Sequence, residues 1–231
     1  MFFFTAIFIF AAFFVSAACG MGGSLILIPA LSLVLGVKEG IVLSSLLLGI
    51  NNIFKLWYYR KDVQLKDSLA LLVIMGLGAV AGAFLMVQME QKILAILLFI
   101  NIGISFLVQR TSNMDVQKGT GLGYALLSGF CSGLSGTSGP LKGLAVRCYF
   151  REKASVVATA SLLSFATDML KSGVYFSQQN WLINPYLLLL GIAMMPLATY
   201  WGQKFNRAMS TRAYDALFYT VMSGYVVRLF I

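Results

Sequence analysis

Ten hydrophobic runs, separated by short polar or glycine-rich stretches, follow one another along the 231 residues. Six of them approach or reach the roughly 20 residues that a helix needs to cross a hydrocarbon core of about 30 Å, and they predict six transmembrane helices. The other four runs are shorter and form two adjacent pairs. The long runs are 40–59, 68–87, 92–109, 154–176, 184–203 and 211–230, and the paired short runs are 2–18 with 24–36 and 119–134 with 140–150.

Each short pair is split by a cluster of glycine and other small residues, at 19–24 in the first pair and at 133–140 in the second. Glycine inside a helix is less stable than alanine by about 1 kcal/mol and permits positive φ, so both clusters predict a break. We expect each pair to form a re-entrant hairpin whose arms enter and leave on the same side of the membrane. Irregular backbone at that depth is tolerated only where it is buried in protein or lines a cavity, so the two tips predict a cavity.

A shift of the chain along itself by 116 residues superimposes the two glycine clusters and, without a gap, aligns residues elsewhere in the two halves. This indicates an internal duplication, with a first membrane repeat at 1–112 and a second at 113–231 that together form one integral membrane domain. Duplicated membrane folds of this kind are typical of secondary transporters. The aligned pairs include Gly20 with Gly136, Gly23 with Gly139, Ser45 with Ser161, Lys55 with Lys171 and Tyr59 with Tyr175.

The distribution of Lys and Arg decides between parallel and inverted halves. With two re-entrant hairpins, each half has three full spans, and eleven basic residues fall on one side of the membrane against three on the other. If each short pair were one broken span, the halves would be parallel and the split would be eight to six. Cytoplasmic loops carry the excess of Lys and Arg, which favours the hairpins. The larger group is Arg60, Lys61, Lys66, Arg110, Lys118, Arg147, Arg151, Lys153, Lys204, Arg207 and Arg212, and the smaller is Lys38, Lys92 and Arg228.

The expected fold is therefore an all-α polytopic membrane protein with two inverted-topology repeats. Each repeat has a glycine-broken re-entrant hairpin and three transmembrane helices, which gives eight membrane segments if each hairpin is counted once. The protein is expected in the cell membrane, which is the inner membrane in a Gram-negative cell. Both termini are expected on the outer side of this membrane, and most basic loops in the cytoplasm. Residues 2–18 followed by Cys19-Gly20 also resemble a cleavable signal, but the basic n-region is missing, so we expect a retained first helix.

Composition excludes the main soluble classes of protein. Hydrophobic residues make up 59% of the chain and charged residues 11%, whereas a soluble domain is about one-quarter charged. A soluble enzyme or a nucleic-acid partner is not expected, and membrane orientation explains the net charge of +9. The chain has no histidine, and its cysteines, Cys19, Cys131 and Cys148, lack CxxC spacing. Zinc, haem and Ser-His-Asp chemistry therefore lack their usual groups, and we expect no cofactor, no metal and no enzymatic activity.

The glycine tips are the candidate binding site. The second arm of each hairpin begins as a helix N-terminus within the membrane, where free N–H groups and the helix dipole favour an anion. The alternative is that the glycines only allow close helix packing, as expected for Gly78-x-x-x-Gly82 and Ala198-x-x-x-Gly202. The candidate substrate-binding residues are Gly20, Gly22, Gly23, Ser24, Ser135, Gly136, Thr137, Ser138, Gly139 and Lys142.

Charged residues within the predicted spans sharpen this hypothesis. Lys142 lies in the first turn of the second inner arm, where Ile26 is its counterpart in the first half, and an anion would supply its missing countercharge. The alternative is a lysine that reaches a water-filled vestibule. Asp168 is the one carboxylate well inside a predicted span, and with Asn52 and Lys171 it is a candidate for coupling to a proton or sodium ion. A plain Asp168–Lys171 ion pair, and snorkelling of Lys55 and Lys171 to the interface, are the alternatives.

Two sequence motifs resemble those of the sulfite exporter TauE/SafE family. The first is Gly20-Met21-Gly22-Gly23-Ser24-Leu25-Ile26-Leu27-Ile28-Pro29-Ala30-Leu31, and the second combines 133–140 with Ala158-Thr159-Ala160-Ser161. The resemblance covers nearly the whole chain and implies two related membrane halves that move sulfite or other sulfur-containing anions. The family commonly has longer glycine runs at the tips and mostly apolar residues where Lys142 and Arg147 stand here.

The sequence thus predicts a secondary transporter that moves a small anion, such as sulfite, thiosulfate or an organosulfonate, by alternating access around the two tips. A passive anion channel is the alternative, and a membrane-embedded enzyme or assembly subunit is ranked last. The expected partners are the anionic solute and the lipid bilayer, and a coupling ion and a homo-oligomer are compatible with the sequence.

Overall fold

The computed structural model describes residues 2–19, 22–97, 100, 118–179, 181 and 183–210. Every regular element in these ranges is a helix, as expected. The predicted run 211–230 lies outside the described residues, as does most of the run 92–109, of which 92–97 are helical. The helices are α1 (Phe2–Cys19), α2 (Gly23–Leu35), α3 (Val37–Tyr58), α4 (Leu65–Gln88), α6 (Lys118–Ser135), α7 (Gly139–Arg147), α8 (Lys153–Gln178) and α9 (Pro185–Ala208).

The described long helices match the predicted runs to within a few residues at each end. Three of them, α3, α4 and α9, are long and apolar enough to cross a membrane. The start of α9 shows how local sequence sets such an end. Asn184 Oδ1 accepts hydrogen bonds from the N–H groups of Tyr186 and Leu187 at 3.1 and 3.2 Å, and Pro185 takes the first helical position.

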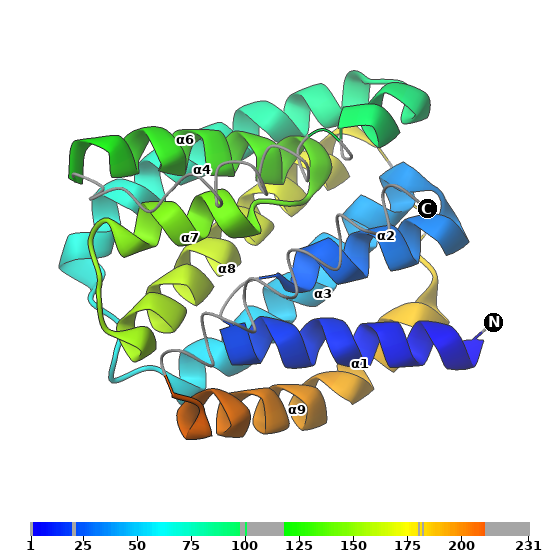
Figure 1. Ribbon diagram of the computed structural model, residues 1–231. Coiled ribbons are helices and arrows are strands. Elements are labelled where there is room, and N and C mark those ends of the chain that lie inside the picture. Colours follow the sequence, from blue (N-terminus) through cyan, green and yellow to red (C-terminus); the bar gives the residue numbers. More distant parts are fainter. Residues whose placement is uncertain are drawn as a thin grey trace.

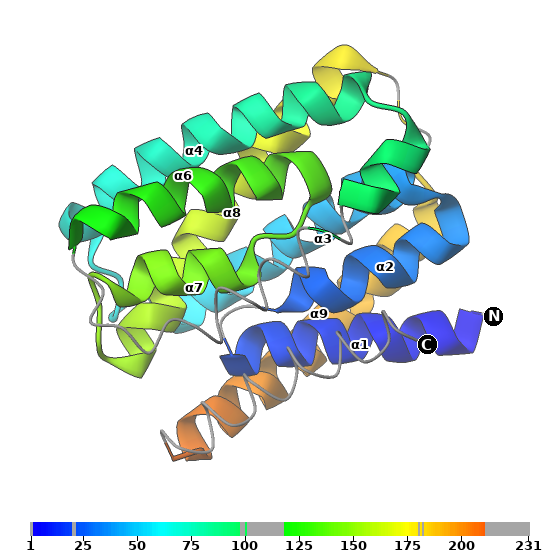
Figure 2. The ribbon, with the colours of Figure 1, turned by 45° about the horizontal axis from the view of Figure 1, so that its top comes forward.

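Both glycine clusters interrupt the helices where the sequence predicts it. In the first, α1 ends at Cys19 and α2 begins at Gly23; in the second, α6 ends at Ser135 and α7 begins at Gly139. Gly22 and Gly136 have φ of 96° and 75°, a conformation that favours glycine. In each pair the second helix runs back beside the first, and the two hairpins enter the bundle from opposite ends (Figures 1 and 2).

Each hairpin packs against a long helix from the other half of the chain. α6 lies against α4, and α1 lies against α9. Small residues bring these backbones together: a Cβ on Gly82 would stand 2.2 Å from the carbonyl oxygen of Phe130, and one on Gly202 would stand 2.5 Å from that of Phe14. The expected packing roles of Gly78-x-x-x-Gly82 and Ala198-x-x-x-Gly202 are therefore confirmed.

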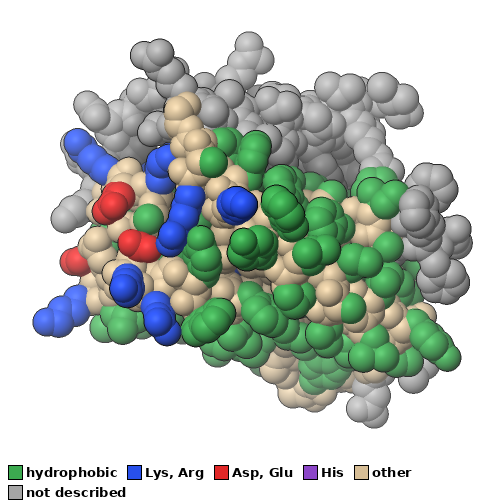
Figure 3. Space-filling view, turned by 90° about the horizontal axis from the view of Figure 1, so that it is seen from below, with side chains coloured by type: hydrophobic (Ala, Val, Ile, Leu, Met, Phe, Trp, Pro, Cys, Tyr) green, Lys and Arg blue, Asp and Glu red, His purple; other side chains and the backbone are tan. Residues whose placement is uncertain are grey.

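Two helices cross at the centre of the bundle. α3 and α8 contact each other, and α2 and α7 each pack on the central helix of their own half. The ends of α3, α7 and α9 and the starts of α4, α6 and α8 lie at one end of the bundle, which we call the basic end (Figure 1). Lys and Arg side chains gather there, while hydrophobic side chains cover much of the remaining described surface in the same view (Figure 3).

Candidate functional site

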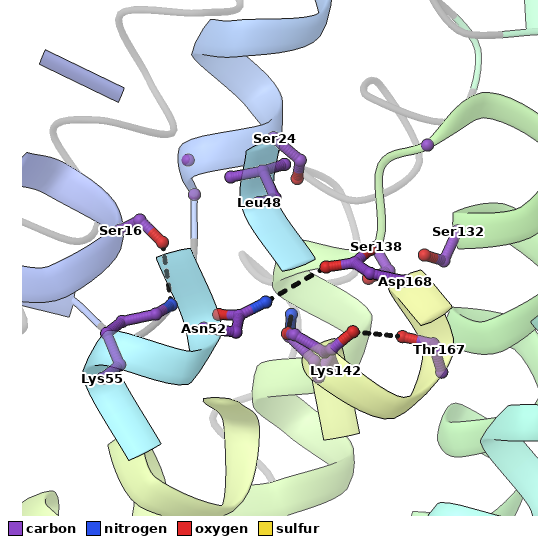
Figure 4. Close-up of a pocket in the computed structure, with 14 residues that line it drawn as sticks. Ser16, Ser24, Leu48, Asn52, Lys55, Ser132, Ser138, Lys142, Thr167 and Asp168 are labelled. Atoms are coloured by element: carbon purple, nitrogen blue, oxygen red, sulfur yellow. Dashed lines mark hydrogen bonds between the residues drawn. The ribbon is translucent and has the colours of Figure 1, made fainter. Parts of the chain in front are cut away.

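A small polar cavity lies where the two hairpin tips meet the crossing of α3 and α8. Its volume is about 20 Å³, which is room for about one water molecule. Helices from both halves of the chain build its wall, and ten of its residues are labelled in Figure 4. We call it the central cavity. It is lined by Ser16, Gly22, Gly23, Ser24, Leu48, Asn52, Lys55, Ser132, Gly136, Ser138, Lys142, Ser164, Thr167 and Asp168.

Two buried lysines make matching contacts in the two halves. Lys55 on α3 donates to Ser16 Oγ on α1 at 2.9 Å, and Lys171 on α8 donates to Ser132 Oγ on α6 at 3.1 Å. The two lysines, and likewise the two serines, are 116 positions apart in the sequence. Each lysine is only 1% exposed, so neither snorkels out of the bundle, and the snorkelling alternative is wrong.

The same spacing joins the two halves directly. Asn52 Nδ2 donates to Asp168 Oδ2 at 3.0 Å across the crossing of α3 and α8 (Figure 4). The other oxygen, Oδ1, lies 2.8 Å from Lys171 Nζ. The Asp168–Lys171 ion pair expected as the structural alternative therefore exists, and it is buried. The pair lies within α8, and the Asn52–Asp168 hydrogen bond links it to α3; breaking a buried pair would leave an uncompensated charge at this crossing.

Lys142 breaks the match between the halves. Its ammonium group donates to Ser164 Oγ, and only 7% of the residue is exposed. It therefore points into the bundle rather than out to a vestibule. The residues 116 positions earlier are Ile26 and Leu48, both apolar. The second half thus places a lysine–serine pair at the central cavity where the equivalent positions of the first half are both apolar.

The buried charges do not balance. Among the described residues, the buried charged side chains are Lys55, Lys142, Lys171 and Asp168, a formal excess of two positive charges. An uncompensated charge in a membrane interior is costly. An anion between the tips would offset this excess, whereas a cation would add to it.

The two tips offer different donors. The first backbone hydrogen bond of α2 runs from Leu25 N–H to the Gly22 carbonyl, so the N–H groups of Gly23 and Ser24 precede the helical ladder. In α7 the second residue is Pro140, which has no N–H. Lys142, in the first turn of α7, therefore supplies positive charge at a tip where one position lacks a backbone donor.

Several predicted site residues come together, and others do not. Ser135 and Thr137 lie in the second tip but bond each other at 3.1 Å and are not among the cavity-lining residues. Lys171 pairs with Asp168 and Gly139 begins α7, but neither is among the cavity-lining residues. Gly20 lies outside the described residues. The predicted residues that line the cavity are Gly22, Gly23, Ser24, Gly136, Ser138, Lys142, Asn52 and Asp168.

The lining glycines also serve packing, which was the alternative to a binding role. A Cβ on Gly23 would stand 2.6 Å from Ser16 Cβ, and one on Gly136 would stand 2.5 Å from Ile28 Cδ1. Close packing is thus established for both positions. It does not compete with a role in binding, because both glycines also line the central cavity.

Sequence reasoning missed Ser16, Ser132, Ser164 and Thr167 as parts of the site. A signal for two of them was present, because Ser16 and Ser132 obey the same shift of 116 residues as the lysines that they bind. Serine is common in membrane helices that pack closely, so the match carries little weight until the contacts are seen.

Comparison with known proteins gives one match. The model of the family described as Sulfite exporter TauE/SafE matches residues 5–229. Neither a curated protein nor a solved structure matches the chain.

Proposed function

The chain belongs to the sulfite exporter TauE/SafE family, and from this premise we propose that it is a secondary transporter of a small sulfur-containing anion such as sulfite, thiosulfate or an organosulfonate. The family is one of membrane transporters, and the apolar helices fit a multi-pass membrane protein. Substrate, mechanism and orientation go beyond the family assignment and are argued below.

The excess positive charge in the bundle carries the proposal. Among the described residues, three buried lysines outnumber one buried carboxylate, and Lys55, Lys142 and Asp168 all line the central cavity. Free N–H groups at the start of α2 and hydroxyls from both tips add donors but no negative charge. A doubly charged oxyanion or a sulfonate has oxygen acceptors on several sides, which suits donors that converge from two hairpins.

The proposed architecture is a duplicated, inverted pair of repeats, at 1–112 and 113–231. Its support is the recurrence of the lysine–serine contact at the same spacing in both halves, and the opposite directions of the two hairpins. Because each hairpin packs on a helix of the other half, the repeats form one unit rather than two separable domains.

Alternating access follows from this architecture. The central cavity has room for about one water molecule, so a larger solute enters only if a tip moves. Rocking of one hairpin with its partner helix against the α3–α8 crossing would open the cavity to one side at a time. We place the basic end in the cytoplasm, because positive charge favours that side.

Asp168 is the proposed coupling residue. A proton or sodium ion that binds its carboxylate would loosen the contacts to Asn52 and Lys171, and so change the crossing of α3 and α8. This links the charge of one side chain to the arrangement of both halves.

Counterflow tests the proposal. Purified protein in proteoliposomes, preloaded with unlabelled anion and without an imposed ion gradient, should take up labelled sulfite, thiosulfate, sulfate or a short sulfonate with saturation. With the membrane potential clamped, a passive channel, the alternative, would let the label equilibrate without the transient accumulation that counterflow through a carrier gives. Folded protein that moves none of these anions contradicts the proposed substrate class.

A further inference from the structure

A stripe of buried polar side chains runs along α9. Thr199, Gln203 and Asn206 are spaced by four and three residues, so they share one helix face, and they are 3%, 3% and 4% exposed. We call them the α9 polar stripe. Buried polar groups are costly in a membrane protein unless they bond a partner, so a stripe of three requires an explanation.

The stripe runs from a contact with α3 to the basic end of the bundle. Thr199 Oγ1 donates to Asn51 Oδ1 at 2.6 Å, and Asn51 precedes the cavity-lining Asn52 in the sequence. Two turns further along α9, Asn206 donates to the carbonyl oxygen of Ala18 near the end of α1 and accepts from Tyr59 Oη at 3.3 Å. The stripe is therefore bordered by α1 and α3, the helices that hold Ser16 and Lys55.

Two donors along this seam have no partner. Among the described residues, Asn51 Nδ2 and Gln203 Nε2 are buried and make no hydrogen bond. The stripe itself carries amides and a hydroxyl but no carboxylate. Unpaired N–H donors in a dry interior favour an acceptor that passes between them, and an oxyanion offers such an acceptor.

The stripe ends behind a surface cavity. This cavity has a volume of about 390 Å³ and is lined by Trp57, Tyr58, Arg60, Lys61, Asp62 and Arg207. The Arg207 guanidinium is held over the Tyr58 ring at 4.4 Å. Tyr59 and Asn206 are each adjacent in sequence to a lining residue, and their hydrogen bond lies inside the bundle. We call this cavity the basic vestibule, because three cations face one carboxylate in its wall.

The described part of the first half has no equivalent stripe at the aligned positions. The positions 116 residues before Thr199 and Gln203 are Ala83 and Val87 on α4, and the position before Asn206 is Glu90, exposed and beyond the end of that helix. Glycine brings the helices together at both seams, since a Cβ on Gly133 would stand 2.1 Å from the Ala79 carbonyl oxygen and one on Gly202 would stand 2.5 Å from that of Phe14, so the polar side chains are what distinguish the α9 seam. A duplication alone would give both seams the same character.

We propose that the α9 polar stripe is the passage by which a small anion moves between the basic vestibule and the central cavity, and that the Tyr59–Asn206 hydrogen bond closes it. The inference rests on the proposed transport of an anion and adds its route and its gate. The Arg and Lys side chains of the vestibule raise the local concentration of anions. The N–H and O–H donors of the stripe then replace the water molecules that an anion loses on entry.

Cysteine accessibility tests the passage. In a background with the three native cysteines changed to Ala, Thr199→Cys and Gln203→Cys place thiols in the stripe, and Ala83→Cys and Val87→Cys are matched controls on α4. Lys66→Cys, at an exposed position of the basic end, calibrates the reagent. The probes are the impermeant anion 2-sulfonatoethyl methanethiosulfonate and its trimethylammonium counterpart. Labelling is followed by mass spectrometry on protein in proteoliposomes.

The anionic reagent should modify the two stripe cysteines at least tenfold faster than the α4 cysteines, and faster than the cationic reagent after calibration on Lys66→Cys. Tyr59→Phe, which removes only the hydroxyl group of the gate, should increase the labelling rate of Gln203→Cys severalfold. Stripe cysteines as unreactive as their α4 counterparts, or equally reactive with both reagents, overturn the passage. Two stripe positions keep the test decisive if one variant does not fold.

This readout requires no transported solute. Labelled stripe cysteines without any anion counterflow would contradict the proposed function and leave an anion-accessible passage standing. Counterflow with an unreactive stripe would retain the transporter and refute this route.

Discussion

Asn52 and Asp168, 116 positions apart in the sequence, meet across the crossing of α3 and α8 in a hydrogen bond of 3.0 Å. The proposed internal duplication would place one side chain of each half at the same point, and in this chain one of the two is an amide and the other a carboxylate. The pair therefore joins the two halves, and it places a negative charge at this position in the second half but not in the first.

Asp168→Asn should abolish gradient-driven uptake while counterflow continues, because the carboxylate is the proposed coupling group. Without it Lys171 has no ion-pair partner in the described interior, and loss of one member of a buried pair costs about 3–5 kcal/mol. Uptake driven by a proton or sodium gradient, compared with counterflow in the same vesicles, separates the two activities. Equal loss of both would argue against coupling.

The exchange of the two residues gives a matched control. Asn52→Asp with Asp168→Asn keeps the net charge and places the carboxylate three residues before Lys55. The thermal midpoint in detergent should recover most of what Asp168→Asn alone loses. A double variant no more stable than the single one would show that the position of the charge, and not only its presence, decides stability.

Ser16→Ala should destabilise the protein more than Ser132→Ala. Each removes an acceptor of one buried lysine, but Lys171 keeps its ion pair with Asp168, whereas Ser16 is the described partner of Lys55, and a buried donor left without a partner costs about 1–3 kcal/mol. Thermal unfolding of the two variants under one set of conditions measures this. An equal or larger effect at Ser132 would contradict this difference between the two contacts.

Gly133→Ala should disrupt the seam between α4 and α6, because the added Cβ would stand 2.1 Å from the Ala79 carbonyl oxygen. We expect a loss of about 1–3 kcal/mol or more, with reduced yield of folded protein. Gly173→Ala is the control, since nothing lies within 4 Å of its added Cβ and alanine favours the helix by up to about 1 kcal/mol. Similar midpoints for the two variants would refute the tight seam.

Much of the fold follows from local pattern. The glycine clusters end α1 and α6 where predicted because glycine both weakens a helix and accepts the positive φ of Gly22 and Gly136. Long apolar runs give α3, α4 and α9 because a bilayer imposes length and hydrophobicity together.

The site was harder to predict, because its contacts join residues far apart in the chain. Lys55 near the end of an apolar run suggested snorkelling, and only the packing of α1 shows that Ser16 holds it inside the bundle. The sequence placed Ser135 and Thr137 in the site, but in the structure these side chains bond to each other. A shift of 116 residues identifies equivalent positions, but it does not say which side chains meet.

The central claim, that an anion binds between the tips, is tested most directly at Lys142. The half-saturation concentration for counterflow of the transported anion should be at least tenfold higher in Lys142→Met than in the unaltered protein. Ile26→Met, at the aligned position of the other hairpin, should leave it unchanged. An unchanged half-saturation concentration in Lys142→Met, with folded protein, would contradict the binding site proposed for this cavity.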